Sequence, residues 1–406
     1  MHIDSPLEGL EAKEGAPAER IRSATRMAFS NIVSLCLREK VSFLVIAGDV
    51  FDGDWKDFST GLFFLRELNR LRDSGCRVYM IRGNHDSASE VTKHLGKLPP
   101  HAHELSSRAP ETLLLDDLGV AIHGYSFPQR AVTEDLVPRY PDPRRGLFNL
   151  GILHTSADGS PEHDSYAPCT VRDLSAKGYQ YWALGHIHKR RILDEDPAWI
   201  VFPGNPQGRH AKETGARGVS LVTVENGEVS SVEHVPTDVV RFESISIELT
   251  EQDGLDELYE VAARDLRKAL ETAAGRLLAV RLRISGRCAA HRAAIERPQE
   301  IVANLRARAQ EIDDDLWLEK VILDTTPVLS LERLRQGKGL VASVLQGLAA
   351  MRANPEAARA FVGETLSALR KTGAAEVEAL RLTDSADDLL RQVELLLAAS
   401  LEEGAT

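Results

Sequence analysis

The sequence lacks several features that would place it outside the ordinary globular proteins. It has four cysteines in 406 residues, and none of them forms a CxxC pair. This spacing argues against a disulfide framework and favours reduced, buried thiols. No run of about 18 apolar residues is available for a membrane span. The acidic N-terminus lacks the basic and then apolar pattern of a signal peptide. We therefore expect a cytoplasmic protein without membrane contact.

An excess of positive charge is also missing, and the net charge is −12. Residues 1–240 contain 27 basic and 33 acidic residues, and residues 241–406 contain 22 and 28. Because both parts are acidic, the chain does not coat nucleic acid through its overall field, and any such contact requires local basic patches. Twelve of the thirteen histidines lie in residues 1–240. Histidine-dependent chemistry is therefore expected in that part.

The pattern of apolar residues divides the chain into three predicted domains. From residue 18 to about 238, short apolar runs alternate with helical patterns, which is typical of an α/β fold. Residues 241–326 show alternating strands and helices, one helix being expected over 292–311, and indicate a small α+β domain. The pattern of residues 327–406 is entirely helical and amphipathic. The length of the chain is compatible with this division.

Four polar motifs stand where predicted strands of the first domain end. They are "AGDVFD" at 47–52, "RGNHDS" at 82–87, "LHTS" at 153–156 and "LGHIHK" at 184–189. Sites in α/β folds are built at the carboxyl ends of the strands, so we expect the four segments to converge on one edge of the sheet.

These motifs supply nitrogen and oxygen donors without thiolate, a set that suits manganese, iron or zinc. The donors are Asp49, Asn84, His85, His154, His186 and His188. One carboxylate among several imidazoles can bridge two ions, as two-metal phosphoester chemistry requires. Each motif alone is equally well explained by a turn or by surface histidines. Only their combination, in this order and at strand ends, indicates a metal centre.

The combination resembles the calcineurin-like metallophosphoesterases, whose motifs are DxH, GDxxD, GNHD/E, H and GHxH. The stretches "IDSPLEGL" (3–10), "YWALGHIHK" (181–189) and "FPGNPQGRH" (202–210) are similar to the SbcD-type DNA-repair exonucleases, most closely to their YhaO-type branch. The resemblance covers residues 2 to about 240. It implies a four-layer α/β/β/α sandwich, followed by a small α+β capping domain and C-terminal helices.

The resemblance also implies a role for each motif residue. Two divalent ions, with manganese expected, would be bound by His2, Asp49, Asn84, His154, His186 and His188. Asp49 would bridge the ions, and His2 and His188 would belong to one of the two sites. His85 would stay off the metals and protonate the leaving oxygen, oriented by Asp86. Asp52 is expected beside the ligands or in the turn, and not as a ligand.

The N-terminus departs from the family pattern. His2 matches the histidine of DxH, so the aspartate would stand one residue ahead of Met1, with the first strand upstream of it. We expect a start placed too late or a shortened gene, which leaves one metal site a ligand short and exposes a strand inside the sheet. Asp4 is the less favoured alternative, as a residue that shifts into the vacant position.

Two basic clusters follow the last motifs. Lys189 and Arg190 come directly after "GHIH", and Arg209 and His210 end the stretch 202–210. Both clusters are candidates for contacts with DNA phosphates near the metals. Solvated loop charges explain them equally well.

The function implied by the resemblance is a manganese-dependent phosphodiesterase that acts on DNA ends in repair, a 3′-to-5′ exonuclease with endonuclease activity as a further option. Its partners would be DNA, an SbcC-like ABC-type coiled-coil ATPase bound through the C-terminal helices, and a second copy of the chain. One alternative is a phosphatase or cyclic-nucleotide phosphodiesterase for small substrates, a class that seldom carries the long segment found here after the catalytic part. The other is a metal-compromised scaffold for the ATPase.

Overall fold

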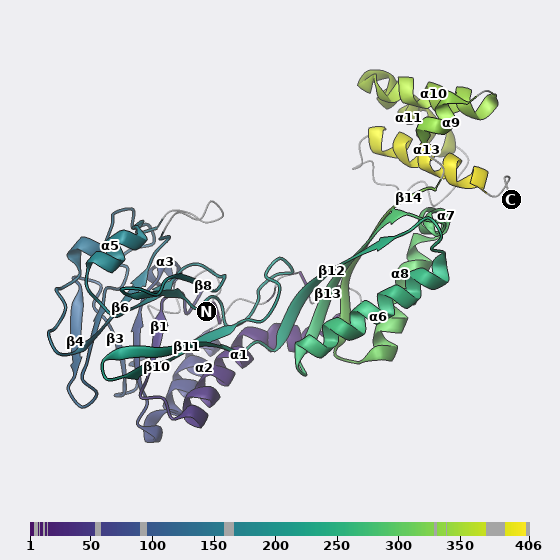
Figure 1. Cartoon of the computed structure of the whole chain (residues 1–406). Helices are drawn as coiled ribbons and strands as arrows, with labels where there is room; N and C mark the ends of the chain where they lie inside the picture. Colours follow the sequence, from purple (N-terminus) through teal and green to yellow (C-terminus); the bar gives the residue numbers. More distant parts are fainter. Residues whose placement is uncertain are drawn as a thin grey trace. The chain divides into compact units, whose positions relative to one another are not determined.

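The computed structural model describes residues 1–3, 7, 9–10, 13, 15–52, 58–89, 96–157, 166–328, 331–337, 339–370 and 386–402, so Asp4 lies outside the described residues. The chain forms two compact units (Figure 1). The first comprises Met1–Glu243 with Thr272–Val280, and the second comprises Ser244–Glu271 with Arg281–Thr406. The three-domain division made from the sequence stays a prediction.

The first unit alternates helices with short strands, as the sequence predicts. In chain order its elements are α1 (Ala18–Glu39), β1 (Phe43–Ala47), α2 (Phe58–Asn69), η1 (Arg72–Ser74), β2 (Arg77–Ile81), α3 (Asn84–Ala88), β3 (Ala102–Glu104), β4 (Glu111–Leu115), β5 (Val120–Gly124), η2 (Val137–Arg139), β6 (Phe148–His154), α5 (Val171–Ala176), β7 (Tyr181–Gly185), β8 (Arg191–Asp194), β9 (Trp199–Phe202), β10 (Gly218–Glu225) and β11 (Glu228–Pro236). The strands β3, β8 and β11 are too short or too polar to have been predicted from the apolar pattern.

The strands of this unit form two larger sheets and a hairpin. One sheet is parallel and has the order β1-β2-β3. The other has the order β4-β5-β6-β7-β9-β8, with a parallel centre from β5 to β9 and an antiparallel strand at each edge. The hairpin pairs β10 with β11. The parallel centre explains why β6 is buried along its whole length and why its sequence does not alternate.

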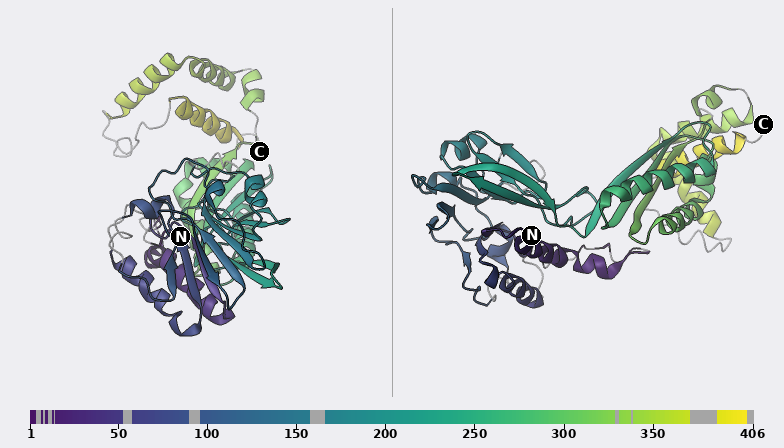
Figure 2. Two further views of the ribbon diagram at one scale, coloured as in Figure 1. Left: turned by 90° about the vertical axis from the view of Figure 1, so that its left-hand side faces the viewer. Right: turned by 60° about the horizontal axis from the view of Figure 1, so that its bottom comes forward.

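The two sheets pack face to face, with helices on their outer sides (Figure 2). Side chains such as Ile81, Ile122 and Ile152 fill the layer between the sheets. Outside the first sheet, α1 and α2 pack through residues such as Phe29. Outside the second sheet, α5 and the neighbouring loops bury Trp182. These layers confirm the predicted four-layer α/β/β/α class.

A cavity of about 1480 Å³ opens between strand edges of the first unit. Among the described residues, β1 pairs only with β2 and β10 only with β11, and both remaining edges line this cavity. Apolar side chains such as Ile32, Leu44 and Leu221 also line it. None of the predicted ligands does. The size of a cavity therefore does not mark the candidate site here.

The second unit combines a three-stranded sheet with helices. Its elements, of which β12, α6 and β13 extend partly into the first unit, are β12 (Val240–Leu249), α6 (Leu255–Ala273), β13 (Leu277–Arg287), α7 (His291–Glu296), α8 (Pro298–Ile312), β14 (Leu316–Thr326), α9 (Leu331–Gln336), α10 (Leu340–Arg352), α11 (Pro355–Arg370) and α13 (Ala386–Glu402). Helices α6 and α8 run along one face of the sheet β12-β13-β14 (Figures 1 and 2).

One helix of this unit differs from the sequence-based expectation. The single helix predicted over 292–311 is two helices, α7 and α8, that separate at Arg297. Pro298 begins α8. Proline has no backbone N–H to donate, and its ring clashes with the preceding turn, so α7 cannot continue through this residue. All four cysteines are buried and none is in a disulfide, as expected. Among the helices that the structure describes, none combines the length and the apolar composition that a membrane crossing requires.

Candidate metal centre

The predicted ligands come from the carboxyl ends of strands that lie in both facing sheets. Asp49 stands two residues after the end of β1, and Asn84 begins the short helix after β2. His154 is the last residue of β6, and His186 directly follows β7. Strand β6 pairs with β7 so that His154 lies opposite Gly185. The sheet layout thus brings these four segments to the same edge, as the sequence predicts.

Asp49 lies at the centre of the group. Its Oδ2 atom is 3.3 Å from Nε2 of His154 and 3.8 Å from Nε2 of His2. Its Oδ1 atom accepts a hydrogen bond from the backbone N–H of His85, at 3.1 Å. Burial alone would raise the pKa of Asp49, but the nearby imidazoles, His154 first, hold it well below its usual range. A buried carboxylate between two histidines is a candidate for the bridging role that the sequence predicts.

His154 shows that this point suits a cation. Its Nδ1 atom donates to the carbonyl oxygen of Ala47 at 2.9 Å, since a carbonyl can only accept. In the neutral ring Nε2 then carries a lone pair, yet it faces Asn84 Oδ1 at 2.9 Å and Asp49 Oδ2. Burial lowers the pKa of His154, but the charge of Asp49 outweighs burial and raises it. Positive charge is thus favoured at this point, and with the ring neutral the three electron-pair donors Nε2, Asn84 Oδ1 and Asp49 Oδ2 suit a divalent ion.

Two groups of candidate donors share Asp49. Within each group the donor atoms lie within 4.8 Å of one another, and the members are Asp49, His154 and His186 in one group and His2, Asp49 and His85 in the other. The ring of His188 stands 5.2 Å from that of His2. A small pocket of about 90 Å³ is lined by Asp49, His2, His186 and His188. The donor set therefore suits two neighbouring ions.

The pKa values of His2, His188 and His85 shift in different directions. Burial and the nearby N-terminal charge lower the pKa of His2 to about 3. Burial also lowers the pKa of His188, against the effect of its bond to Glu213. For His85, burial lowers the pKa, but Asp52 and Asp49 outweigh it and raise the pKa to about 9. The lowered pKa values of His2 and His188 favour the neutral ring, which is the form that binds a metal ion.

Asp52, and not Asp86, is the carboxylate that faces His85. Asp52 Oδ1 lies 3.0 Å from His85 Nδ1 and 3.2 Å from His2 Nδ1. Asp86 instead accepts hydrogen bonds from the backbone N–H groups of Phe51 and Gly83, at 2.9 and 3.1 Å. Burial and the charge of Asp49 raise the pKa of Asp86 to about 6. Asp86 thus fastens the two motif loops together, while Asp52 orients the imidazole.

The backbone at the predicted ligands is strained. His2, Asp49 and His186 have φ values of 51°, 53° and 96°, a region that non-glycine residues seldom occupy. Such strain clusters at functional sites, where the surrounding structure holds it in place. Gly185 has a steric role, because an added Cβ would stand 1.8 Å from the carbonyl oxygen of Ala47 and 2.8 Å from His154 Nδ1.

The basic residues predicted to bind substrate lie in different surroundings. Arg209 reaches the centre, where its guanidinium is 2.6 Å from Asp52 Oδ2. His210 lies beside it with a side chain that is 60% exposed. Lys189 is exposed. Arg190 instead lies near Tyr181 and His234. The structure therefore brings Arg209, but not Arg190, to the predicted metal ligands.

One residue of the site was not found from the sequence. Glu213 lies with Oε1 2.8 Å from His188 Nδ1. Burial would raise the pKa of Glu213, but the bond to His188 lowers it to about 2. The residue stands in a loop without periodicity, 25 positions after its partner. The only available signal was its place just after "GRH", which does not by itself indicate a contact.

Comparisons with known proteins agree with this geometry. Residues 22–190 match the model of the calcineurin-like phosphoesterases, and residues 242–326 match the middle domain of the metallophosphoesterase YhaO. YhaO of Bacillus subtilis is 35% identical over 295 residues, which is 70% of each chain. The DNA double-strand break repair protein Mre11 of Sulfurisphaera tokodaii is 24% identical over 222 residues, 52% of this chain and 56% of that protein. A component of the nuclease SbcCD of Escherichia coli is 24% identical over 259 residues, 54% of this chain and 64% of that protein.

The fold, the donor set and these matches define a metal-dependent phosphoesterase. Within that class, the chain belongs to the YhaO-type branch of the calcineurin-like metallophosphoesterases. The resemblance inferred from the motifs is thus confirmed. Divalent metals are the cofactors of this family, and the groups around Asp49 are suited to hold them.

Proposed function

We propose that the chain is a manganese-dependent phosphodiesterase that shortens DNA from its 3′ ends by a two-metal mechanism. The observation that carries the proposal is the position of Asp49 Oδ2 between His154 and His2. When bound, two ions would supply positive charge that neutralises a phosphodiester and activates the attacking water. The relatives described as a DNA repair protein and as part of a nuclease support DNA as the substrate.

The residues of the chain would share the work as follows. His154, His186 and Asn84 hold one ion with Asp49, and His2 and His188 hold the other with it. His85, whose Nδ1 faces Asp52, presents its other nitrogen to the leaving oxygen and donates a proton to it.

Arg209 would neutralise the substrate phosphate. It stands beside the centre and its side chain is 21% exposed. Lys189 and His210 would make weaker phosphate contacts. Lys189 is exposed on the loop after β7, and His210 is exposed on the loop after β9, next to Arg209. Arg190 lies near His234, so its side chain would have to move before it could contact the phosphate.

The test measures hydrolysis by the purified protein after its metal has been removed with EDTA, with and without added Mn²⁺. The substrates are double-stranded DNA labelled at the 5′ or the 3′ end, single-stranded DNA, a cyclic nucleotide and bis-p-nitrophenyl phosphate. We expect products that shorten progressively from the 3′ end, and no cleavage by the His186→Ala variant. Activity restricted to the small substrates would favour the phosphatase alternative. Absence of both activity and bound metal would favour the scaffold alternative.

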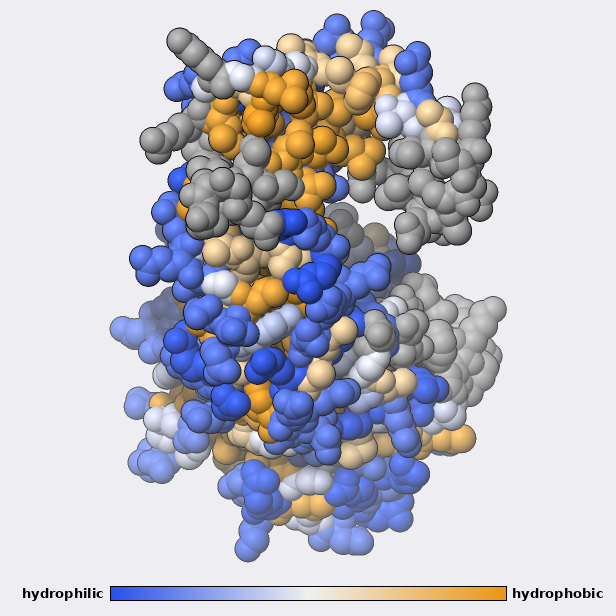
Figure 3. Space-filling model, turned by 90° about the vertical axis from the view of Figure 1, so that its right-hand side faces the viewer, coloured by the Kyte–Doolittle hydropathy of each residue, from blue (hydrophilic) through white to orange (hydrophobic). Residues whose placement is uncertain are grey.

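We also propose that the helices of residues 331–402 bind an SbcC-like coiled-coil ATPase. The protein would act as a homodimer, in the cytoplasm. Apolar side chains are exposed on these helices, including Leu340 at 82% and Phe361 at 44%. Figure 3 shows apolar surface gathered over this part of the second unit. Co-purification with a coiled-coil ATPase that Leu340→Glu weakens would support the partner. A strictly monomeric mass in solution would contradict the dimer.

A further inference from the structure

His188 is held by two groups outside the predicted ligand set. Its Nδ1 atom lies 2.8 Å from Glu213 Oε1. Its carbonyl oxygen accepts a hydrogen bond from the guanidinium of Arg217, also at 2.8 Å. The side chain of Glu213 is only 9% exposed, so water competes little for the carboxylate. Both the ring and the backbone of His188 are therefore fixed by the loop between β9 and β10.

The contact with Glu213 determines where the ring carries its proton. An ionised carboxylate can only accept a hydrogen bond, so Nδ1 of His188 must donate. In a neutral ring, the lone pair then stands on Nε2, which is the atom left for a metal ion. Metal-binding histidines in general donate their other ring N–H to a carboxylate or a carbonyl in this way. His154 does the same with the carbonyl of Ala47.

Glu213 is itself held in a defined orientation. Its Oε2 atom accepts a hydrogen bond from the backbone N–H of Arg209 at 2.7 Å. Its own N–H donates to the carbonyl of His210 at 2.9 Å. With both carboxylate oxygens engaged, the side chain has little freedom to turn away from His188. The carboxylate is thus preorganised for this contact.

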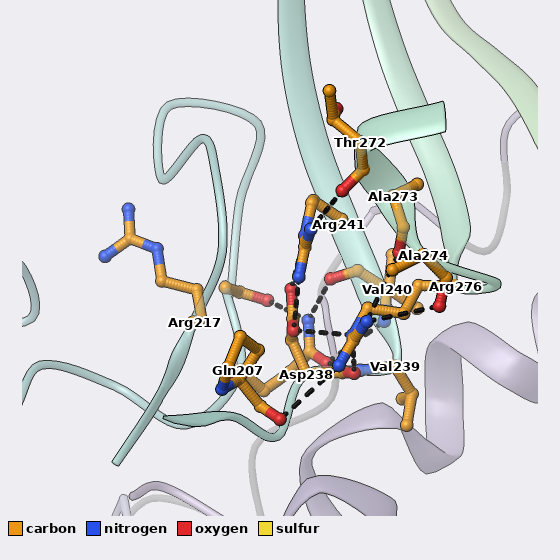
Figure 4. Close-up of polar contacts among 12 residues, drawn as sticks. Gln207, Arg217, Asp238, Val239, Val240, Arg241, Thr272, Ala273, Ala274 and Arg276 are labelled. Carbon is orange, nitrogen blue, oxygen red and sulfur yellow. Dashed lines mark hydrogen bonds and ion pairs between the residues drawn. The ribbon is translucent and has the colours of Figure 1, made fainter. Parts of the chain in front are cut away.

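The loop that carries Glu213 is fastened at both ends (Figure 4). At its start, Gln207 donates to the carbonyl of Val240 at 2.6 Å and accepts from the N–H of Val239 at 2.9 Å. At its end, the carbonyl of Arg217 accepts hydrogen bonds from the N–H groups of Thr237 and Asp238. These contacts hold the loop against the first residues of β12 and the segment before it.

We propose that Glu213 is a positioning residue that holds His188 in the tautomer and orientation that bind a divalent ion next to His2. The proposal rests on the two-metal site of the proposed function. Both carboxylate oxygens of Glu213 are already engaged, Oε1 with His188 Nδ1 and Oε2 with the N–H of Arg209. Glu213 therefore acts through His188 and does not serve as a ligand.

The first test needs no metal and no activity. In metal-free protein with ¹⁵N-labelled histidine, long-range ¹H–¹⁵N spectra report the tautomer of each ring. The signal of His188 is assigned from its loss in His188→Gln. We expect a proton on Nδ1 in the wild type and a shift toward the Nε2-protonated tautomer in Glu213→Ala. The same tautomer in both proteins would overturn the proposal.

The second test measures Mn²⁺ binding by calorimetry. In Glu213→Ala we expect one of two ions to bind about 10- to 100-fold more weakly, the usual effect of losing such a partner, and the other to bind as in the wild type. Saturating Mn²⁺ should then restore most of the rate. Glu228→Ala, at an exposed position of the β10–β11 hairpin, is the control and should leave both affinities unchanged.

Two results of the calorimetry would contradict the positioning role of Glu213. One is equal affinity of both sites in Glu213→Ala and in the wild type. The other is an equal loss at both sites together with a lower melting temperature, which indicates a general structural role. If the wild type binds Mn²⁺ but cleaves no DNA, the proposed function fails, and the tautomer comparison still decides the role of Glu213.

Discussion

The carboxylate of Asp52 lies 3.0 Å from Nδ1 of His85. This contact leaves Nε2 of His85 as the nitrogen that can face a substrate, and it joins the "GDVFD" loop to the "GNHD" loop. Asp52 Oδ2 also accepts a hydrogen bond from the guanidinium of Arg209, at 2.6 Å. One aspartate thus connects the predicted proton donor with a predicted phosphate-binding residue.

His85→Ala should retain bound metal and lose cleavage. The proposed role of His85 is protonation, and general acid catalysis contributes about 10²- to 10⁴-fold to a rate. Metal content by atomic emission and the rate of DNA hydrolysis give the two measurements. The donor atom of His85 lies close enough to those of Asp49 and His2 to reach an ion. A clear loss of metal in the variant would therefore place His85 among the ligands.

Asp49→Asn should abolish hydrolysis and the stabilisation by Mn²⁺ without unfolding the metal-free protein. Asp49 contributes to both predicted ion sites and not to core packing. For a single site, an ion at 100 times its Kd stabilises the folded state by about 2.7 kcal/mol. The melting temperature of the wild type should therefore rise on adding Mn²⁺ and fall again with EDTA.

Asp117→Asn is the matched control for this variant. Asp117 pairs at the surface with Arg77, which begins β2, whereas the predicted ligands follow the other end of that strand. It should respond to Mn²⁺ like the wild type. Equal stabilisation of the Asp49→Asn variant by Mn²⁺ would show that the carboxylate does not bridge the ions.

The strand-end motifs made the convergence of four candidate ligands predictable. Asp49, Asn84, His154 and His186 stand at the ends of apolar runs, and the carboxyl ends of neighbouring parallel strands lie at the same edge of a sheet. The layered class follows from the same alternation of strands and helices. These inferences need only local patterns and the general rules of α/β folds.

The contacts that orient the ligands were not predictable in the same way. Arg209 meets Asp52 across 157 positions of sequence, and both stand in loops without periodicity. Asp86 was the expected partner of His85 because it is the next residue, but its side chain turns toward the N–H groups of Phe51 and Gly83. Such choices depend on tertiary packing. The left-handed backbone of Asp49 and His186 is likewise invisible in the sequence.

Gly185→Ala should destabilise the first unit and weaken the metal centre. The added Cβ would stand 1.8 Å from the carbonyl of Ala47, which also accepts the hydrogen bond that orients His154. Overpacking of a close interior contact typically costs about 1–3 kcal/mol. Chemical denaturation and Mn²⁺ titration measure the two effects. Gly347→Ala in α10, where an added Cβ meets nothing within 4 Å, should be neutral or stabilising.

Arg241→Ala should be among the most destabilising single changes on charged residues of the first unit. The carboxylate of Asp238 is fully buried and lies 3.0 Å from the Nε atom of Arg241 and 2.9 Å from that of Arg276 (Figure 4). Arg241 also donates to the carbonyl of Thr272 at 2.7 Å. Removing one partner of a buried pair leaves an uncompensated charge and costs about 3–5 kcal/mol. Because Arg276 remains, we expect the lower end of this range.

Arg283→Ala supplies the comparison that isolates burial from charge. Arg283 pairs with Asp324 at 3.2 Å, but the two side chains are 51% and 55% exposed. Exposed pairs contribute about 0–1 kcal/mol, because water screens the charges and both side chains lose freedom on pairing. Urea unfolding of both variants, followed by tryptophan fluorescence and circular dichroism, gives the two losses. If Arg241→Ala costs no more than Arg283→Ala, then Arg276 alone neutralises Asp238, and the buried pair does not hold the start of β12 to the C-terminal end of α6 at Thr272.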